Sequence, residues 1–291
     1  MPHNLSGTGI AIVTPFLDNG EIDLQGLEKL LNHNIKGGVD YLVVLGTTGE
    51  SAVLNKKEKA IITSFVKEYV NERIPLVLGI GGSNTSLLID EIQSIDLKGY
   101  DAILSVSPYY NKPTQEGIYQ HYKALSSAST LPIILYNVPG RTSSNITAET
   151  TIRLAYDFDN IIAIKEASGD MNQIMKIIKD KPKDFLVISG DDGLTLPMIY
   201  MGADGVISVL GQAYPNEFSK MVRYGLEGKQ KVANAIHYQL YRFLDPLYCD
   251  GNPAGIKAAL KILGICGDKL RLPLVNVQKE THQRIEHLIK Q

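Results

Sequence analysis

The sequence predicts an α/β protein of one architecture, a (β/α)8 TIM barrel with a C-terminal helical appendage. Eight short apolar runs recur along the 291 residues, amphipathic stretches separate them, and the last part of the chain is helical throughout. Strands that alternate with helices form parallel βαβ units, and eight such units close a barrel. The predicted strands span residues 9–14, 41–45, 76–80, 102–106, 133–136, 161–165, 185–189 and 205–209.

The stretches between the strands carry apolar residues at helical spacing. The pattern is clearest over 55–70, where Asn55 and Glu58 resemble a capping box. Ser168 and Asp170 likewise indicate the start of a helix after the sixth strand. Further helices are predicted over residues 87–95, 171–178 and 194–201.

Beyond Val209 the pattern is helical only, with predicted helices over 215–227, 232–247, 254–263 and 277–290. One helix is enough to complete the eighth unit of a barrel. We therefore expect residues 1–225 to form the barrel with its site, and residues 226–291 to form a helical region packed on it.

A doubly wound open sheet is the structural alternative. Such sheets usually carry a glycine-rich phosphate-binding turn after a strand. The nearest candidate is Gly79-Ile80-Gly81-Gly82-Ser83-Asn84, which has Asn84 in place of the third glycine. The sequence therefore does not favour dinucleotide binding.

The charge balance argues against two classes of partner. Lys and Arg number 29 against 31 for Asp and Glu, which gives a net charge of −2 without a long charged block. Nucleic-acid and membrane-surface proteins usually carry a basic patch or stripe. We also see no apolar run near the roughly 18 residues of a membrane span, so we expect no nucleic acid and no membrane as partners.

The cysteines and the N-terminus favour a cytoplasmic location. Cys249 and Cys266 form neither a CxxC pair nor a metal-ligand spacing, which suits a reducing compartment. Residues 1–5 lack the basic and apolar segments of a secretory signal. The six histidines are scattered, so the sequence predicts no metal site.

The most informative residue is Lys165, which ends the apolar run Ile161-Ile162-Ala163-Ile164. Consecutive apolar residues indicate a strand buried on both faces. A lysine at such a place is unusual because its ammonium is costly to remove from water, and desolvation favours the neutral, nucleophilic amine. That amine can condense with a ketone to a Schiff base. Taken alone, a strand-end lysine is more often ion-paired or extended towards water.

The other strand ends are also polar. Residues just after the strands of a barrel share one face, where active sites form. Hydroxyls occur in 46–51, phenols in 107–113 and again at Tyr136, and a guanidinium at Arg141. An amine, phenols, hydroxyls and a guanidinium on one face favour carbonyl chemistry on an anionic substrate.

Each of these residues also has a structural interpretation. Tyr136 suits a strand-end aromatic with its hydroxyl in water, and Thr47 suits a turn. Arg141 suits a loop cation, and Asp191 with Asp192 suits the cap of the next helix. A metal site at the aspartates is disfavoured, because no histidine lies nearby in the sequence.

Four motifs together resemble one family. They are Gly46-Thr47-Thr48-Gly49-Glu50-Ser51, Tyr109-Tyr110-Asn111-Lys112-Pro113, Tyr136-Asn137-Val138-Pro139-Gly140-Arg141-Thr142 and Ile164-Lys165-Glu166-Ala167. In order and spacing, from Gly9 to Pro273, they resemble the dihydrodipicolinate synthase family. That family stands within the wider group of N-acetylneuraminate lyase and class I pyruvate aldolases, and the Tyr109-Tyr110 pair with Arg141 favours the synthase.

The resemblance implies a Schiff-base-forming lyase. Lys165 would condense with pyruvate, Tyr136 would shuttle protons, and Thr47 and Tyr110 would link Tyr136 to solvent. The enamine would attack L-aspartate 4-semialdehyde to give 4-hydroxy-tetrahydrodipicolinate, the first committed step of diaminopimelate and lysine biosynthesis. No cofactor and no metal are implied, because the imine is the electrophile.

The same resemblance implies the binding residues and the assembly. Thr48 and the amides of its turn would hold the carboxylate of pyruvate, and Arg141 would hold that of the semialdehyde. Gly190 and Ile207 would line the pocket. Since the counterpart of Tyr110 reaches the neighbouring subunit in that family, we expect a homotetramer built as a dimer of dimers.

The sequence departs from the family at a lysine effector site. The matching residues of this candidate site are Ser51, Ala52, Asn84 and Tyr109. Leu88 stands where lysine-inhibited members carry Glu, and Lys56 stands where His is frequent. Without that carboxylate the effector's ammonium lacks a partner, so we expect weak or absent inhibition. Asn252-Pro253-Ala254-Gly255 replaces the usual Asn-Pro-Ile-Pro and carries no functional prediction.

Two other functions stay open. A sialic acid lyase or a keto-deoxy-sugar-acid aldolase of the same family would use Lys165 and Tyr136 with another acceptor pocket. A non-enzymatic barrel that senses a small acid is the second, and the intact set of Lys165, Tyr136, Thr47, Tyr110 and Arg141 weighs against it.

Overall fold

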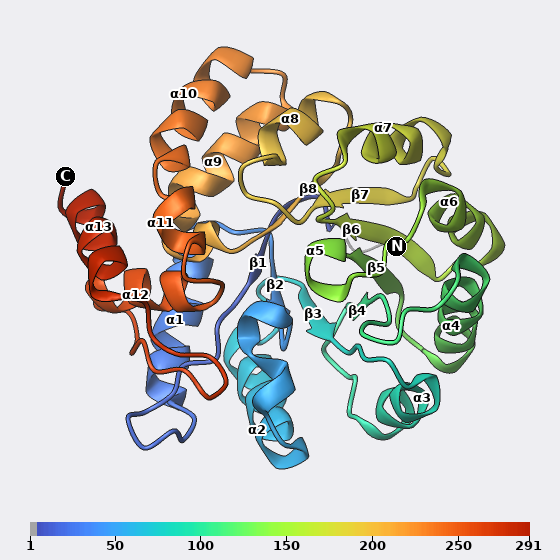
Figure 1. Cartoon of the computed structure of the whole chain (residues 1–291), viewed down its shortest axis with the longest axis horizontal. Coiled ribbons are helices and arrows are strands. Elements are labelled where there is room, and N and C mark those ends of the chain that lie inside the picture. Colours follow the sequence, from blue (N-terminus) through green and yellow to red (C-terminus); the bar gives the residue numbers. More distant parts are fainter. Residues whose placement is uncertain (1–4) are drawn as a thin grey trace.

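A computed structural model describes residues 5–291 and shows a closed barrel of parallel strands in the order β1 to β8, in which β8 pairs with β1 (Figure 1). The strands are β1 (Gly7–Ala11), β2 (Tyr41–Val44), β3 (Leu76–Gly79), β4 (Ala102–Val106), β5 (Ile133–Asn137), β6 (Ile161–Glu166), β7 (Leu186–Ser189) and β8 (Gly205–Ser208). The predicted fold class and all eight predicted strands are confirmed. Residues 1–4, on which the interpretation of the N-terminus partly rests, lie outside the described part of the chain.

Helices surround the barrel (Figure 1). They are α1 (Leu24–Lys36), α2 (Lys56–Val70), α3 (Thr85–Ser94), α4 (Gln115–Ala128), α5 (Pro139–Thr142), α6 (Ala148–Asp157), α7 (Met171–Asp180), α8 (Thr195–Tyr200), α9 (Pro215–Leu226), α10 (Gln230–Tyr241), α11 (Leu244–Tyr248), α12 (Ala254–Ile262) and α13 (Lys279–Lys290). The predicted capping box of Asn55 and Glu58 starts α2, and Asp170 caps α7.

Two hydrophobic layers follow from the alternation of side chains along each strand. One set points into the barrel, where it includes Val43, Leu104 and Ile207, and the other packs against the helices. Tyr41 fills part of the interior, and a Cβ on Gly9 would lie 2.2 Å from its ring. The interior is therefore a packed core, and chemistry is confined to the mouth at the strand ends.

The first strand ends earlier than predicted. β1 stops at Ala11 rather than at residue 14, because a glutamine side chain replaces the strand pairing. Gln212 donates to the Ala11 carbonyl at 3.1 Å and accepts from the Val13 amide at 3.0 Å. Apolar patterning alone cannot reveal such a substitution, since residues 12 and 13 are still buried.

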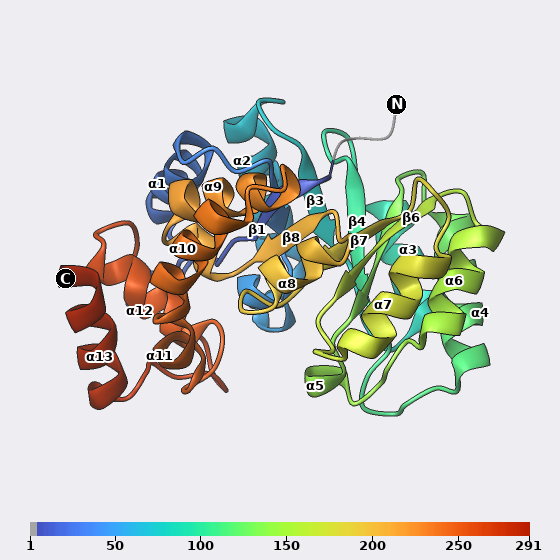
Figure 2. The ribbon, with the colours of Figure 1, turned by 90° about the horizontal axis from the view of Figure 1, so that it is seen from above.

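The helix predicted over 232–247 is two helices, α10 and α11. Pro246 explains the break, because proline has no N–H for the carbonyl four residues earlier and its ring clashes there. α11 then turns back towards the barrel mouth. Figure 2 shows α11, α12 and α13 at one end of the molecule, and α4, α6 and α7 at the other.

A buried ion pair joins this C-terminal region to the barrel. Lys257 of α12 donates to Glu50 at 2.5 Å, and both side chains are fully buried. Glu50 follows the turn after β2, and its other carboxylate oxygen accepts from the Arg271 amide at 3.2 Å. The division of the chain at residues 225 and 226 stays a prediction.

Candidate active site

The lysine and the tyrosine singled out from the sequence lie together at the barrel mouth. Tyr136 on β5 and Lys165 on β6 are register partners. Lys165 is 5% exposed and Tyr136 is 6% exposed, and the Lys165 Nζ lies 4.4 Å from the centre of the Tyr136 ring. An amine and a phenol are thus held side by side in a largely desolvated place, which suits nucleophilic and proton-transfer chemistry.

Two further predicted residues shape this place. A Cβ on Gly190, just after β7, would lie 2.7 Å from the Ala167 Cβ and 3.0 Å from the Lys165 Cε. The absence of a side chain at Gly190 therefore makes room for the lysine. Ile207 on β8 is buried in the barrel interior, in the same cluster as Tyr136.

The turn after β2 carries both predicted threonines. Thr48 is buried and its Oγ1 accepts a hydrogen bond of 2.9 Å from Asn252, whereas Thr47 is exposed. Leu45 enters this turn with φ +58°, a backbone region that few residues other than glycine adopt. Strain of this kind is found where a turn must hold a functional geometry.

The predicted relay is not formed within one chain. No hydrogen bond joins Thr47 or Tyr110 to Tyr136 among residues 5–291. Tyr110 is 93% exposed and adopts φ +70°. A bulky residue in this conformation is a backbone outlier.

The structure brings two of the predicted effector residues close together and adds Ser83 between them. The Ser83 hydroxyl donates to the Tyr109 carbonyl at 2.8 Å and accepts from the Tyr109 amide at 3.1 Å. Asn84 follows directly and caps α3. Ser51 and Ala52 lie in a short 3-10 helix after the β2 turn.

The two departures from the family motifs lie in α2 and α3, and at the contact between α11 and α12. Leu88 is buried in α3 and Lys56 is exposed at the start of α2. A Cβ on Gly255 would lie 2.1 Å from the Leu247 carbonyl oxygen, so α11 and α12 approach each other too closely for a larger residue. Asn252 is the residue that contacts Thr48.

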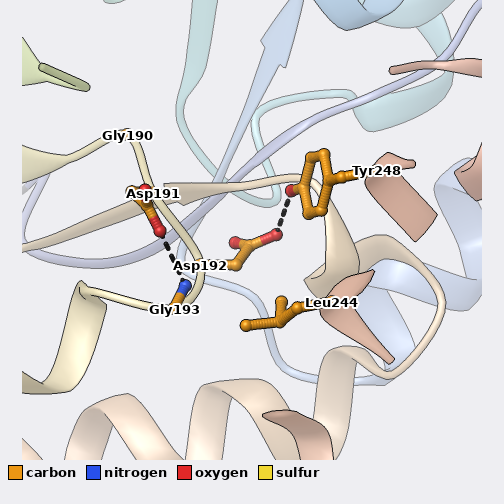
Figure 3. Close-up of a pocket in the computed structure, with 6 residues that line it drawn as sticks. All are labelled: Gly190, Asp191, Asp192, Gly193, Leu244 and Tyr248. Atoms are coloured by element: carbon orange, nitrogen blue, oxygen red, sulfur yellow. Dashed lines mark hydrogen bonds between the residues drawn. The ribbon is translucent and has the colours of Figure 1, made fainter. Parts of the chain in front are cut away.

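A cavity of about 180 Å³ adjoins Gly190 (Figure 3). It is lined by Gly190, Asp191, Asp192, Gly193, Leu244 and Tyr248. Tyr248 and Leu244 belong to α11, so the C-terminal region forms one wall. Burial and the Asp192 carboxylate raise the pKa of Tyr248, while the charge of Arg141 acts in the opposite direction. Arg141, the predicted carboxylate-binding residue, is exposed on α5.

The two aspartates of this cavity differ in role. Asp191 accepts from the amides of Gly193 and Leu194 at 2.9 and 3.1 Å, so it holds the turn before α8. Asp192 instead accepts from the Leu210 amide and the Tyr248 hydroxyl, both at 2.7 Å. The capping interpretation is thus wrong for both aspartates, because the N-cap of α8 is Leu194, whose side chain forms no capping hydrogen bond. Burial raises the pKa of Asp192 despite these donors.

Glu166, the neighbour of Lys165, is a buried charge that the sequence patterns did not single out. Its carboxylate is fully buried and accepts from Asn137 and Gln173 side chains and from the Ser168 amide. A signal existed, because a charge in a strand that is apolar on both faces needs a partner. The partners themselves could not be found from sequence spacing.

The described chain offers neither a metal centre nor a membrane span. No group of three or more His, Cys, Asp or Glu side chains within residues 5–291 is placed to hold a metal ion. In the same range, every helix is too short or too polar to cross a bilayer.

The fold and the mouth together define a (β/α)8 barrel protein whose centre pairs a buried lysine with a tyrosine. The chain belongs to the Dihydrodipicolinate synthetase family, which it matches over residues 4–291.

Similar proteins cover nearly the whole chain. It is 54% identical to the 4-hydroxy-tetrahydrodipicolinate synthase of Flavobacterium psychrophilum over 285 residues, 98% of this chain and 97% of that protein. The dihydrodipicolinate synthase structure from Thermotoga maritima superimposes with a TM-score of 0.96 at 38% identity, covering 99% and 98% of the two chains. A monomeric dihydrodipicolinate synthase variant matches with a TM-score of 0.95 at 38% identity, covering 98% and 96%.

Proposed function

We propose that this chain condenses pyruvate with L-aspartate 4-semialdehyde to 4-hydroxy-tetrahydrodipicolinate, as a Schiff-base-forming lyase of diaminopimelate and lysine biosynthesis. The observation that carries the proposal is the Lys165–Tyr136 pair, with the amine 4.4 Å from the centre of the phenol ring. Near-full-length relatives named for this activity support it.

The first half of the reaction activates pyruvate. The Lys165 Nζ adds to the ketone carbon, and the Tyr136 hydroxyl gives its proton to the leaving water, so that an imine and a phenolate result. The imine withdraws electrons from the adjacent methyl group, so a methyl proton leaves to the Tyr136 oxygen and an enamine forms. General acid–base catalysis needs the phenol within reach of that proton, and Tyr136 is the neighbouring register partner of Lys165.

The second half forms the carbon–carbon bond. The enamine carbon attacks the aldehyde carbon of the semialdehyde, and Tyr136 returns the proton to the new alkoxide. The amine of the same substrate then adds to the imine carbon, and Lys165 leaves as the free amine. The ring closes in this step, and the enzyme is regenerated.

Substrate carboxylates are assigned to two places. Thr48 and the amides of the turn after β2 hold the pyruvate carboxylate, and the buried position of Thr48 supports this. Arg141 holds the semialdehyde carboxylate, because a guanidinium donates two parallel hydrogen bonds to a carboxylate. Gly190 and Ile207 give the pocket its shape.

The proton relay is assembled between two copies of the chain. Thr47 and Tyr110 link Tyr136 to solvent, and Tyr110 is supplied by the neighbouring copy. Its 93% exposure and positive φ support this assignment. The assembly is a dimer of dimers in the cytoplasm, and its centre acts without a cofactor.

Feedback control by lysine is weak or absent. The effector site of Ser51, Ala52, Asn84 and Tyr109 lacks a carboxylate at Leu88, and Lys56 adds a like charge for the effector's ammonium. Inhibition of the purified enzyme by sub-millimolar lysine would contradict this proposal.

The activity is tested by supplying pyruvate with one of two aldehydes. We expect the purified chain to consume pyruvate with aspartate semialdehyde and not with N-acetylmannosamine, and Lys165→Ala to be inactive with both. Turnover of the sugar aldehyde instead would favour the sialic acid lyase. Pyruvate consumption by Lys165→Ala equal to that of the unaltered chain would contradict the proposal.

A further inference from the structure

Glu166 is buried on the outer face of the barrel, directly behind the reaction centre. Lys165 points into the mouth, so the next residue along β6 points to the helix layer. There the Glu166 carboxylate is 0% exposed. Burial raises its pKa, and the surrounding donors act in the opposite direction. A buried carboxylate is costly, and an apolar pair of similar size is often at least as stable.

Hydrogen bonds from three residues surround this carboxylate. Asn137 on β5 donates to both oxygens, at 3.2 and 3.1 Å. The Ser168 amide donates to one oxygen at 2.8 Å, and Gln173 on α7 donates to the other at 3.0 Å. All three donors come from segments that also carry or follow a residue of the proposed centre.

The contact between β5 and β6 fixes the register of the two catalytic side chains. Asn137 pairs with Glu166 one step beyond the Tyr136–Lys165 pair. The ladder between these strands is irregular at its other end, where the partner shifts between Ile133 and Ile134. Because a slip of one residue turns every side chain to the opposite face, an irregular ladder needs another constraint on its register.

The same network reaches the segment after Arg141. The Asn137 Oδ1 accepts from the Ile146 amide at 2.9 Å, and its Nδ2 donates to Asn145 at 2.8 Å. Asn145 in turn donates to Gln173 at 2.8 Å. The chain between α5, which carries Arg141, and α6 is thereby tied to the back of β5 and β6.

We propose that Glu166 is a positioning residue: from the outer face of the barrel it aligns the strand of Lys165, the strand of Tyr136 and the segment that follows Arg141. The inference rests on the proposed function, since it concerns the geometry of that reaction. Glu166 touches neither substrate. It acts through its hydrogen bonds, which an ionised carboxylate can accept from all three donors at once.

The test is Glu166→Gln, which keeps the shape and removes two acceptor positions. In either orientation of the new amide, its NH2 group faces at least one of the three donors, so that hydrogen bond is lost. We expect kcat and the rate of borohydride-trapped pyruvate adduct formation to fall about 10–100-fold, with KM for pyruvate within about threefold, because a misplacement near 1 Å costs about this much. KM should stay nearly unchanged because Thr48, the proposed pyruvate-carboxylate contact, lies on the turn after β2.

Glu68→Gln, an exposed position on α2, is the matched control and should leave kcat unchanged.

A rescue experiment with a double variant distinguishes a positioning role of Glu166 from a general loss of stability. In Asn137→Asp/Glu166→Gln the carboxylate moves to β5 and accepts from the new amide on β6, so the strand contact is restored. We expect the double variant to recover at least about tenfold of the lost kcat. Recovery of the urea midpoint without recovery of kcat would overturn the proposal, since it would leave only a structural role.

The outcomes distinguish the two proposals. Absence of any adduct on the unaltered chain would overturn the proposed function and the inference with it. An adduct on the unaltered chain together with an undiminished kcat in Glu166→Gln would overturn the inference alone. If Glu166→Gln does not fold, Gln173→Met removes one donor at similar volume. It should lower kcat about threefold or more at unchanged KM, and an unchanged kcat would again overturn the inference.

Discussion

At the residue scale, function depends on how closely neighbours approach the lysine. Gly190 has no side chain, and its backbone lies against the Lys165 methylenes. Lys165 in turn lies over the Tyr136 ring. The three residues come from β5, β6 and the turn just after β7, so the reactive amine is confined from two sides.

Gly190→Ala should therefore lower activity. The added Cβ would lie 2.7 Å from the Ala167 Cβ and 3.0 Å from the Lys165 Cε, so the lysine must shift. We expect kcat/KM for pyruvate to fall about 100-fold. Gly140→Ala is the matched control, because a Cβ there meets nothing within 4 Å. Equal activity of the two variants would show that Gly190 does not confine the lysine.

A buried histidine predicts how stability depends on pH. His121 on α4 contacts the Thr85 hydroxyl at 2.8 Å, and burial lowers its pKa from 6.5 to about 4. The folded state thus binds fewer protons than the unfolded state, so stability is full above about pH 6.5 and falls as the pH drops towards 4. At about 1.4 kcal/mol for each pKa unit, the loss reaches up to about 3 kcal/mol.

This dependence is measured by urea unfolding at a series of pH values. His121→Asn keeps a polar atom for Thr85 and cannot titrate, so the difference between the two chains isolates the histidine from the buried carboxylates. A difference that stays constant between pH 7 and 4 would contradict the expectation.

At the element scale, the C-terminal helices complete the site instead of only covering the barrel. Asn252 contacts Thr48, Tyr248 contacts Asp192, and Lys257 contacts Glu50. Each bond runs from the C-terminal region to a loop at the barrel mouth. The turn after β2 is held from both sides, because Thr14 also donates to the Gly49 carbonyl at 2.7 Å.

Removal of one partner of the buried ion pair should be costly. Lys257→Met leaves the Glu50 carboxylate buried without its cation, and we expect a loss of about 3–5 kcal/mol in the free energy of unfolding. Glu50→Gln/Lys257→Met removes both charges and should recover more than half of that loss. Urea unfolding at one fixed protein concentration measures both, and a single variant within about 1 kcal/mol of the unaltered chain would refute the claim.

Most of the elements could be predicted from the sequence, and the contacts that complete the site could not. Alternating apolar runs fix the strand order of a barrel, so the sequence alone places Lys165 and Tyr136 on neighbouring strands. Asn252 and Tyr248 follow β2 and β7 by long stretches of chain, and no pattern signals where such residues return. The early end of β1 could not be predicted for the same reason, because a hydrogen bond from the distant Gln212 side chain replaces the strand pairing there.

At the scale of the whole molecule, the proposed proton relay needs a second copy of the chain. Tyr110 is almost fully exposed in a strained conformation, and no hydrogen bond within residues 5–291 connects it to Tyr136. One structurally similar protein is described as a monomeric dihydrodipicolinate synthase variant.

Dilution should reduce activity. If Tyr110 completes the relay of another copy, specific activity falls as the oligomer dissociates. Tyr110→Phe should lower kcat about 10–100-fold where the oligomer is intact, a typical contribution of a proton-transfer group, and should match the unaltered chain once both are dissociated. Activity assays paired with analytical ultracentrifugation measure both. A fully active monomer would refute the cross-subunit role.

The most direct test of the account is to identify the lysine that reacts with pyruvate. The chain is treated with pyruvate and borohydride, digested, and mapped by mass spectrometry, with Lys165→Ala beside it. We predict one reduced pyruvate adduct, on Lys165, and none on the variant. Lys257, which is also buried but paired with Glu50, serves as the internal control. An adduct on Lys257 or another lysine, or no adduct at all, would contradict the central claim.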